Sequence, residues 1–217
     1  MVLYCLCPKR EGFRTISSPS IKGKSSYILT VQLNTGLTDV GARLWNAVVA
    51  EDVSLVDYCS LFDSVSLCFS KGMSTPVGSV IVGSTGFIKK ARHFKKAFGG
   101  GIRNPGILSA ACLISLNQIF PRIARTHVIA KDIAKRLEKI GYRISLPVDT
   151  NMVFVDLEIL RVSEKKFQEY CAREGVQVFD YHRIVVHHQT SAEGVDKLIL
   201  AMTRLMEDVK IGKFRES

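Results

Sequence analysis

Apolar and polar residues alternate most regularly after Gly41, where the pattern predicts a succession of helices and strands. Apolar positions spaced three and four apart predict helices over residues 42–52, 85–98, 163–173 and 190–209, and a longer helical region from 105 towards 140. Short apolar runs predict strands at 64–69, 77–82, 151–157, 176–179 and 183–188. Strands and helices mixed in this way are typical of an α/β protein.

Glycine, proline and capping residues mark where these elements end. The triplet Gly99-Gly100-Gly101 should stop the helix before it. Pro121 should kink or break the long helical region, which Gly141 closes. The run Thr190-Ser191-Ala192-Glu193 fits a capping box and should open the last helix. The apolar stripe of that helix would consist of Leu198, Ile199, Met202, Leu205 and Met206.

Residues 1–36 differ from the remainder of the chain. They are basic, rich in serine and glycine, and lack a sustained apolar period, so a loop or disorder is expected there. Residues 27–33 could form a strand, which the Asn34-Thr35-Gly36 run would end.

Composition places the chain among ordinary globular proteins. It has 217 residues, of which 47% are hydrophobic, so it can bury a core. We find no window that approaches roughly 18 uncharged apolar residues, and the first ten residues do not resemble a secretory signal. A soluble cytoplasmic protein without a membrane partner is expected. Six cysteines lack paired metal-ligand spacing, so reduced thiols are the expectation: Cys5, Cys7, Cys59, Cys68, Cys112 and Cys171.

The formal net charge of +10 raises the question of a nucleic-acid partner. Much of the excess falls on the helix expected at 85–98, with Arg103 just beyond it. A solvated face or a site for a small anion explains that cluster as well as DNA does. No helix-turn-helix, zinc finger or RNA-binding signature accompanies it, so no nucleic-acid partner is expected.

Lys71 is the candidate for chemistry, in the run Ser66–Ser79, written SLCFSKGMSTPVGS. It ends an apolar run and is followed by turn residues. A surface strand end would explain this lysine, but burial of the strand would also partly desolvate the amine and free it to attack a carbonyl. Ser70 and Ser74 could bind an anion there, and Gly72 would let other groups approach the backbone.

The order of motifs resembles the L-threonine aldolases, fold-type I pyridoxal phosphate enzymes of the aromatic amino acid β-eliminating lyase and threonine aldolase group. The resemblance runs from about residue 38 to about residue 210. It rests on the segment around Lys71, the run DVGARLWNA at 39–47 and the turn GGGIR at 99–103. Two later runs also contribute, DTNMVFVDL at 149–157 and RIVVHHQTSAEGVDKL at 183–198.

The resemblance implies a function and roles for five residues. Lys71 matches the lysine that carries the cofactor, and Asp39 matches the acid that pairs with its pyridinium nitrogen. Arg43 matches an arginine near the ring oxygen and the substrate carboxylate. Arg103 matches an arginine that reaches the phosphate from a neighbouring subunit, and Arg183 matches the clamp on the substrate carboxylate. The implied reaction cleaves threonine or allo-threonine to glycine and acetaldehyde in a homo-oligomer, a dimer or tetramer.

The resemblance also implies an architecture with three parts. Residues 1–36 would be a non-family segment, 37–141 part of the cofactor-binding large domain, and 142–217 a C-terminal α+β small domain. The family's segment upstream of the acid motif has no counterpart in residues 1–36. An alternative hypothesis is therefore a non-catalytic truncated remnant that keeps the fold and the subunit contacts only.

One residue departs from the family's acid motif, Asp-Gly-Ala-Arg. Val40 separates Asp39 from Gly41, and side-chain directions alternate along a strand. The extra residue would turn the carboxylate away or require a bulge. No metal is expected, because His187 and His188 adjoin on a predicted strand and would point to opposite faces.

Overall fold

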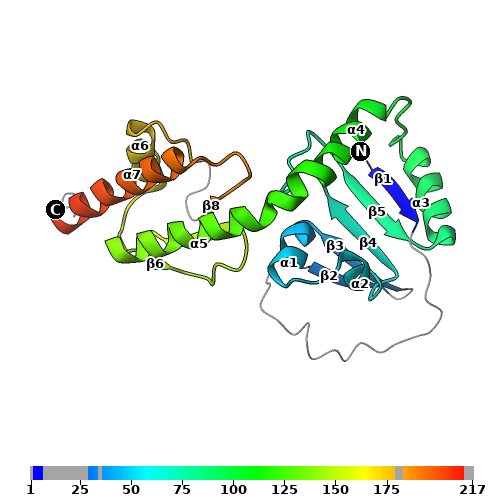
Figure 1. Ribbon diagram of the computed structural model, residues 1–217, viewed down its shortest axis with the longest axis horizontal. Helices are drawn as coiled ribbons and strands as arrows, with labels where there is room; N and C mark the ends of the chain where they lie inside the picture. Colours follow the sequence, from blue (N-terminus) through cyan, green and yellow to red (C-terminus); the bar gives the residue numbers. More distant parts are fainter. Residues whose placement is uncertain (1, 7–28, 34–35, 179–182, 213–217) are drawn as a thin grey trace. The chain divides into compact units, whose positions relative to one another are not determined.

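The computed structural model describes residues 2–6, 29–33, 36–178 and 183–212, with side chains described from Gly41 onward. The chain divides into two compact units, Met1–Ile123 and Ala124–Ser217 (Figure 1). The loop expected over residues 7–28 lies outside the described residues, whereas Val2–Leu6, also expected as loop, forms strand β1.

The first unit contains a five-stranded mixed sheet in the order β1-β5-β4-β3-β2. Its strands are β1 (Val2–Leu6), β2 (Leu29–Leu33), β3 (Gly36–Gly41), β4 (Ser64–Cys68) and β5 (Ser79–Gly83). The pairs β3–β4 and β1–β5 are parallel, while β4–β5 and β2–β3 are antiparallel. The strands expected at 64–69 and 77–82 are thereby confirmed as β4 and β5.

Four α-helices accompany this sheet: α1 (Leu44–Ala50), α2 (Leu55–Cys59), α3 (Thr85–Ala97) and α4 (Gly106–Ile114). α1 contacts β4, and α3 contacts β5 and β1. Ser84 caps α3 by accepting a hydrogen bond from the Phe87 amide at 3.3 Å, and Gly99 ends it with a φ of 75°. Because a positive φ suits glycine, the glycine triplet stops this helix as expected.

The long helical region changes its winding before Pro121. α4 is followed by a π-helical turn η1 (Ser115–Ile119), a 3-10 turn η2 (Phe120–Arg122) and α5 (Ile123–Ile140). Proline has no amide hydrogen and its ring crowds the preceding turn, so an unbroken α-helix cannot continue through it. The break expected at Pro121 is confirmed, and it takes the form of a π turn followed by a 3-10 turn.

The core of the first unit gathers around Trp45. The Trp45 ring meets Phe69 edge-on at 5.1 Å and Phe120 edge-on at 5.5 Å, between ring centroids. Edge-to-face contacts of this kind add to the free energy of burial. Trp45 is a core residue, since its side chain is 3% exposed. Other buried members are Leu44, Val48, Val65, Leu67, Met73, Cys112 and Ile123.

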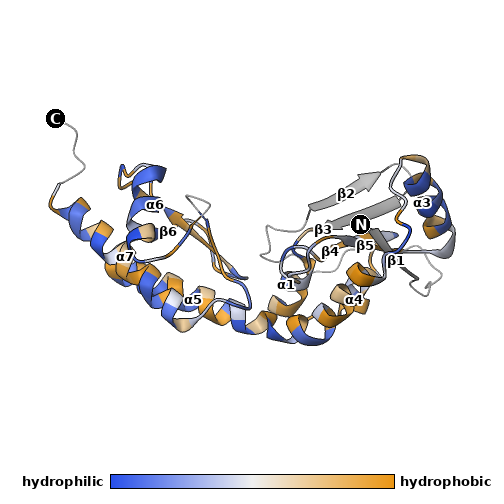
Figure 2. Ribbon diagram, turned by 90° about the horizontal axis from the view of Figure 1, so that it is seen from above, coloured by the Kyte–Doolittle hydropathy of each residue, from blue (hydrophilic) through white to orange (hydrophobic). Residues whose placement is uncertain are grey.

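The run Gly106–Ile140 is long and apolar enough to cross a membrane by length and composition alone. The sequence pattern had suggested no such stretch. Figure 2 shows α4 as hydrophobic over most of its length. A helix of a globular protein can pass the same test, so this property by itself is a weak indication of a membrane span.

The second unit combines three helices with a small antiparallel sheet in the order β6-β7-β8. Its strands are β6 (Arg143–Ile144), β7 (Met152–Asp156) and β8 (Arg183–Val185). Its helices are α5, α6 (Glu164–Arg173) and α7 (Ala192–Lys210). The strand expected at 176–179 is wrong for residues 176–178, which follow Gly175 without regular structure.

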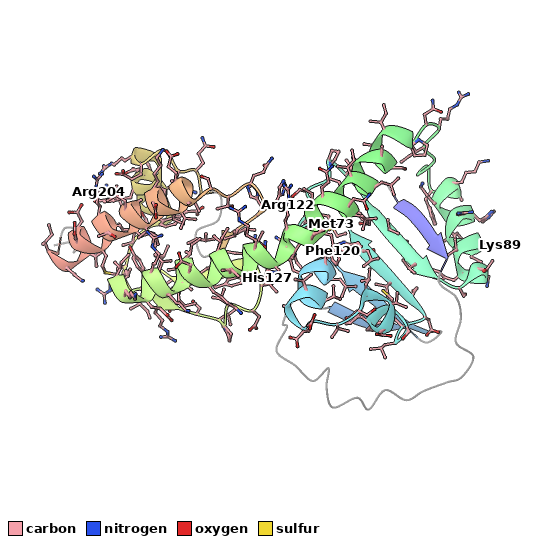
Figure 3. The ribbon with its side chains drawn as sticks, in the orientation of Figure 1. Met73, Lys89, Phe120, Arg122, His127 and Arg204 are labelled. Carbon is pink, nitrogen blue, oxygen red and sulfur yellow. The ribbon has the colours of Figure 1, made fainter. Side chains whose placement is uncertain are left out.

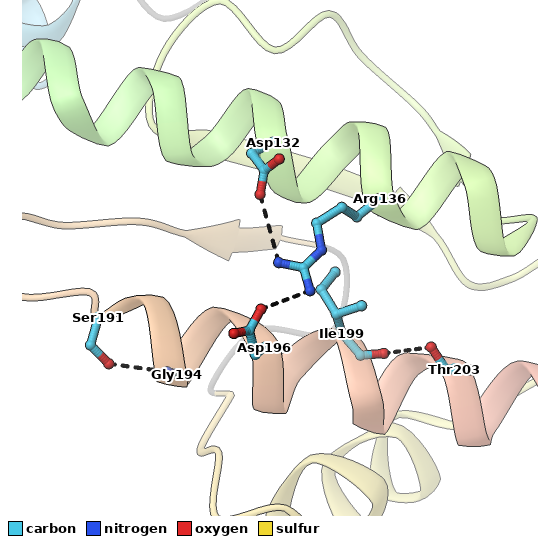
Figure 4. Close-up of polar contacts among 7 residues, drawn as sticks. All are labelled: Asp132, Arg136, Ser191, Gly194, Asp196, Ile199 and Thr203. Carbon is cyan, nitrogen blue, oxygen red and sulfur yellow. Dashed lines mark hydrogen bonds and ion pairs between the residues drawn. The ribbon is translucent and has the colours of Figure 1, made fainter.

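The helices of this unit pack through one apolar core. Ile133, Ala134 and Leu137 of α5 are buried with Leu198, Met202 and Leu205 of α7. This confirms the predicted stripe of α7. Arg136 of α5 links the two helices by an ion pair to Asp196 of α7 at 2.8 Å, and it also pairs with Asp132 of its own helix at 3.7 Å (Figure 4). The division into compact units falls at Ile123 rather than near residue 142, because α5 contributes its apolar face to the second unit's core.

The last helix starts one residue later than a cap at Thr190 would give. Ser191 is the N-cap, and its hydroxyl accepts a hydrogen bond from the Gly194 amide at 3.0 Å (Figure 4). The Thr190 hydroxyl instead accepts from the His187 amide at 3.1 Å. Ser191 therefore caps the helix, and Thr190 fixes the backbone just before it.

Candidate active site

Lys71 and Arg43 leave the sheet at the same edge. β3 and β4 run parallel and pair Gly41 with Leu67. Arg43 stands two residues after the end of β3, and Lys71 stands three residues after the end of β4. Because both strands point the same way, the two side chains belong to loops at their carboxyl ends. Ligands of α/β sheets bind at such ends.

The Lys71 loop has a defined backbone. The Phe69 amide donates to the Gly78 carbonyl at 3.0 Å, and the Thr75 amide donates to the Phe69 carbonyl at 3.1 Å. The Ser74 amide closes a turn by donating to the Lys71 carbonyl at 2.9 Å. Ser74 adopts a φ of 55°, which is uncommon for a residue with a side chain. The lysine therefore sits in a tight, internally bonded turn.

The loop around Lys71 contains both buried and exposed side chains. Phe69 and Met73 are buried, whereas Ser70, Lys71 and Ser74 are exposed. The sequence had suggested a partly desolvated amine, and the structure corrects this, because the loop carries the Lys71 side chain out of the core. Cys68 is half-buried, and its sulfur lies 3.4 Å from the Ser70 hydroxyl.

Gly41, the last residue of β3, has no room for a side chain. A Cβ on Gly41 would lie 2.7 Å from the Leu44 Cβ and 2.9 Å from the Ser66 carbonyl oxygen. Both distances are below those of real carbon contacts, so only glycine fits between α1 and β4. The DVGAR run thus places Arg43 at the N-cap of α1, where it is half-buried.

Asp39 lies on β3 in an unbroken ladder. It pairs with Thr30 on β2 and with Val65 on β4, and the pairing continues through Val40 to Gly41. The bulge considered for the extra residue Val40 is absent from this described stretch of the ladder. The side chain of Asp39 lies outside the described residues, so its predicted role stays a prediction.

Arg103 and Arg183 lie elsewhere in the chain. Arg103 is exposed and helps to line a shallow hollow of about 480 Å³ beside α3. Lys71 is not part of that lining, which consists of Arg92, Lys95, Lys96, Gly101, Ile102 and Arg103. Arg183 belongs to the second unit, where it opens β8 and is half-buried.

No cluster of three potential metal ligands occurs among the described residues. The rings of His187 and His188 lie 5.9 Å apart, beyond the end of β8. The strand expected through these two histidines therefore ends earlier, at Val185.

The sequence model of the beta-eliminating lyase family matches residues 34–160, more than half of the chain. This chain belongs to the beta-eliminating lyase family. The matched region contains Asp39, Arg43, Lys71 and Arg103, while Arg183 follows it.

Several curated relatives with similar sequences are named threonine aldolases. The chain is 41% identical to the low-specificity L-threonine aldolase of Candida albicans over 167 residues, covering 77% of this chain and 45% of that protein. It is 42% identical to the probable low-specificity L-threonine aldolase of Schizosaccharomyces pombe over 170 residues, covering 77% and 43%. The chain thus spans less than half the length of these curated relatives.

Solved structures show the same fold. A Listeria monocytogenes protein described as an L-allo-threonine aldolase superposes with a TM-score of 0.61 at 22% identity, covering 78% of this chain and 52% of that one. The implied α/β architecture, a partial fold-type I large domain followed by a C-terminal α+β part, is confirmed at the level of the fold.

Three residues that hold the Lys71 loop from outside were not predicted from the sequence. Asn46, Trp45 and Ser115 are all buried and all contact that loop. Asn46 and Trp45 lie in the DVGARLWNA run, in which only Asp39 and Arg43 were predicted as site residues. The signal for Ser115 was a polar residue at a buried position of an apolar helix.

Proposed function

We propose that this chain carries the lysine-bearing part of a pyridoxal-phosphate-dependent aldehyde lyase of the threonine aldolase type. One observation carries the proposal. Lys71 projects an exposed amine from a tightly bonded turn at the same sheet edge as Arg43, in a chain that shares 41% identity with a low-specificity L-threonine aldolase.

The residues at this edge suit such a cofactor. The Lys71 amine is exposed, so it is accessible to condense with an aldehyde. Arg43 adds a cation beside the same strands, which suits the anionic groups of the cofactor and of an amino acid. When bound, pyridoxal phosphate supplies an electron sink for the charge left at Cα as the Cα–Cβ bond breaks.

The other roles follow from the family resemblance. Asp39 would pair with the pyridinium nitrogen, and Arg103 would reach the phosphate of a cofactor held by another subunit. Arg183 would bind the substrate carboxylate through its two parallel N–H donors. A base takes the β-hydroxyl proton of threonine or allo-threonine, and the products are glycine and acetaldehyde. We place the reaction in the cytoplasm, in amino-acid metabolism.

A homo-oligomer, dimer or tetramer, belongs to the same proposal. Apolar side chains on α4 and after α3 are exposed in the single chain, including Ile107 at 85% and Phe98 at 84%. Exposed apolar residues of this size are common at subunit interfaces. Their burial between copies would also bring Arg103 towards a neighbouring subunit.

The second candidate is a non-catalytic remnant that keeps the fold and the subunit contacts. The exposure of the Lys71 side chain fits this candidate as well, because an exposed lysine just after a strand needs no cofactor to explain it. The two candidates differ in one observable, which is cofactor binding through Lys71.

The test is a titration of the purified chain with pyridoxal phosphate. Lysine-bound cofactor absorbs near about 420 nm, and this band is expected for the natural chain. Lys71→Ala should remove the band and leave the thermal unfolding midpoint unchanged. Lys89→Ala is the matched control, because Lys89 is an exposed lysine on α3 of the same unit (Figure 3). A folded chain without the band would favour the remnant.

A further inference from the structure

The two ends of the Lys71 turn are held by side chains from distant parts of the first unit. The Trp45 indole Nε1 on α1 donates a hydrogen bond to the Cys68 carbonyl at 3.0 Å. The Ser115 hydroxyl donates to the Met73 carbonyl. These carbonyls lie three residues before and two residues after Lys71, so the turn is fixed on both sides of the amine.

A third contact acts at the residue next to Lys71. A Cβ on Gly72 would lie 2.5 Å from the Asn46 side-chain nitrogen, so that amide fills the space beside the glycine. Asn46 is 1% exposed and belongs to α1, like Trp45. Gly72 is therefore the residue that lets the loop backbone lie against α1. The group that we expected to approach the backbone closely at Gly72 is the side-chain amide of Asn46.

Polar groups from the core are thus directed at the loop backbone. Trp45 and Ser115 are each 3% exposed, whereas Lys71 is exposed. A buried N–H or O–H keeps its hydrogen bond only while the acceptor stays in place, and a buried donor without an acceptor is costly because it has also lost its contact with water. Movement of the loop away from α1 or from Ser115 would leave these donors unsatisfied, so the contacts resist it.

The π-helical turn η1 begins at Ser115, the residue whose hydroxyl binds the Met73 carbonyl. Ser115 is the first residue of the π-helical turn η1, and Pro121 follows that turn. Single π turns inside α-helices occur frequently at functional sites, because the added residue redirects the side chains around it. Here the turn begins at the residue whose hydroxyl reaches the Met73 carbonyl. Phe120, just after the turn, packs its ring on Trp45. The same break in the helix therefore supports both Trp45 and Ser115, the two residues that bind the ends of the Lys71 turn.

We propose that Trp45, Asn46 and Ser115 are positioning residues that fix the base of Lys71. This inference rests on the proposed function of Lys71 as the cofactor-bearing lysine. Lysine has a flexible four-carbon stem, so the position of its amine is controlled only where the stem leaves the backbone. Misplacing a reacting group by about 1 Å can cost about a hundredfold in rate, so a loosened turn should slow chemistry more than it weakens binding.

The test compares Ser115→Ala with Ser115→Thr, which keeps the hydroxyl. Ser109→Ala is the matched control, because Ser109 lies on α4 and its hydroxyl makes no hydrogen bond within the described part of the chain. The first readout needs no cofactor and is amide hydrogen exchange at Ser74 and Thr75. Ser115→Ala should raise exchange there about five- to tenfold, the effect of one lost hydrogen bond. Ser115→Thr and Ser109→Ala should stay within about twofold of the natural chain.

The second readout uses the cofactor and threonine. Ser115→Ala should lower kcat for threonine cleavage by about tenfold or more with KM nearly unchanged, and Ser115→Thr should restore most of it. Trp45→Phe keeps the aromatic packing but removes the N–H donor, so it should raise exchange at the Phe69 amide and lower kcat in the same way.

Distinct results overturn the two ideas. Exchange at Ser74 and Thr75 that stays unchanged in Ser115→Ala would overturn the positioning role, as would an equal rise at every amide of β4 and β5. A loosened turn with the kcat of the Ser109→Ala control would overturn it too. A natural chain that forms no band near about 420 nm would overturn the proposed function instead, whatever the exchange data show.

Discussion

At the scale of single residues, His127 on α5 has an unusual environment for an imidazole (Figure 3). It is 6% exposed, and burial, with a smaller contribution from the Lys131 charge, lowers the pKa of His127 from 6.5 to about 4. The folded pKa lies below the unfolded one, so unfolded chains bind the extra proton between these values. Folding is therefore favoured fully above pH 6.5 and is weakened as the pH falls towards 4.

We predict that the free energy of unfolding drops by up to about 1.4 kcal/mol per pH unit within this window because of His127. Urea titrations at about pH 7 and about pH 5 would measure it, for the natural chain and for His127→Gln. The variant should lose less stability between the two pH values. Equal losses in the two proteins would contradict the prediction.

Gly41 provides a second prediction at this scale, because α1 and β4 leave no room for a Cβ. Gly41→Ala should lower the free energy of unfolding by about 1–3 kcal/mol, the range for overpacking. Gly86→Ala is the control, since nothing lies within 4 Å of a Cβ built there. Alanine in the first turn of α3 should be neutral or stabilise by up to about 1 kcal/mol. Chemical denaturation of both variants decides the matter, and similar effects would count against the steric argument.

At the scale of elements, the start of α7 depends on one hydroxyl. Ser191→Ala should cost about 1 kcal/mol in the free energy of unfolding, because the Gly194 amide loses its acceptor. Ser191→Asp keeps an acceptor and also places a negative charge at the helix N-terminus, so it should retain the stability. Urea unfolding followed by circular dichroism would measure both variants. If Thr190→Ala alone reproduced the loss, the cap would be Thr190, as a capping box at that residue implies.

At the scale of the whole molecule, each unit has its own buried core. The core residues of the second unit all lie between Ala130 and Met206, and those of the first lie between Leu44 and Ile123. We predict that residues 124–217 fold alone and unfold cooperatively in urea. Within that fragment Leu205→Ala should cost about 2–5 kcal/mol, because Leu205 is fully buried. Leu200→Ala, on the exposed side of the same helix, should cost little. A fragment without a cooperative transition would contradict this view.

Local sequence signals located most elements of both units because they act over a few residues. Gly99, Gly141 and Pro121 ended or broke helices where the pattern placed them, and the stripe of α7 entered the core. These signals depend on backbone φ, a missing amide hydrogen or the period of apolar positions. Strand β1 and the missing strand at 176–178 were misjudged, because pairing with a distant neighbour, or the lack of it, decides whether a short segment is a strand.

The sequence alone also identified the family and the candidate site residues. The runs around Arg43, Lys71 and Arg103 resembled the family before any coordinates, and the family match covers the region that contains them. Their roles stay predictions. The sequence could not show that the Lys71 side chain is exposed, since its burial depends on how the loop leaves the sheet rather than on the apolar run before it.

Only the tertiary structure decided which residues hold the lysine in place. Trp45 and Ser115 are separated from the carbonyls they bind by 23 and 42 positions along the chain. A hydrogen bond over such separations needs β4, α1 and the π turn to be packed first, and no local pattern encodes that packing. The sequence determined the family and marked Lys71 as the candidate reactive residue, and the packing of the first unit determined how the Lys71 loop is anchored.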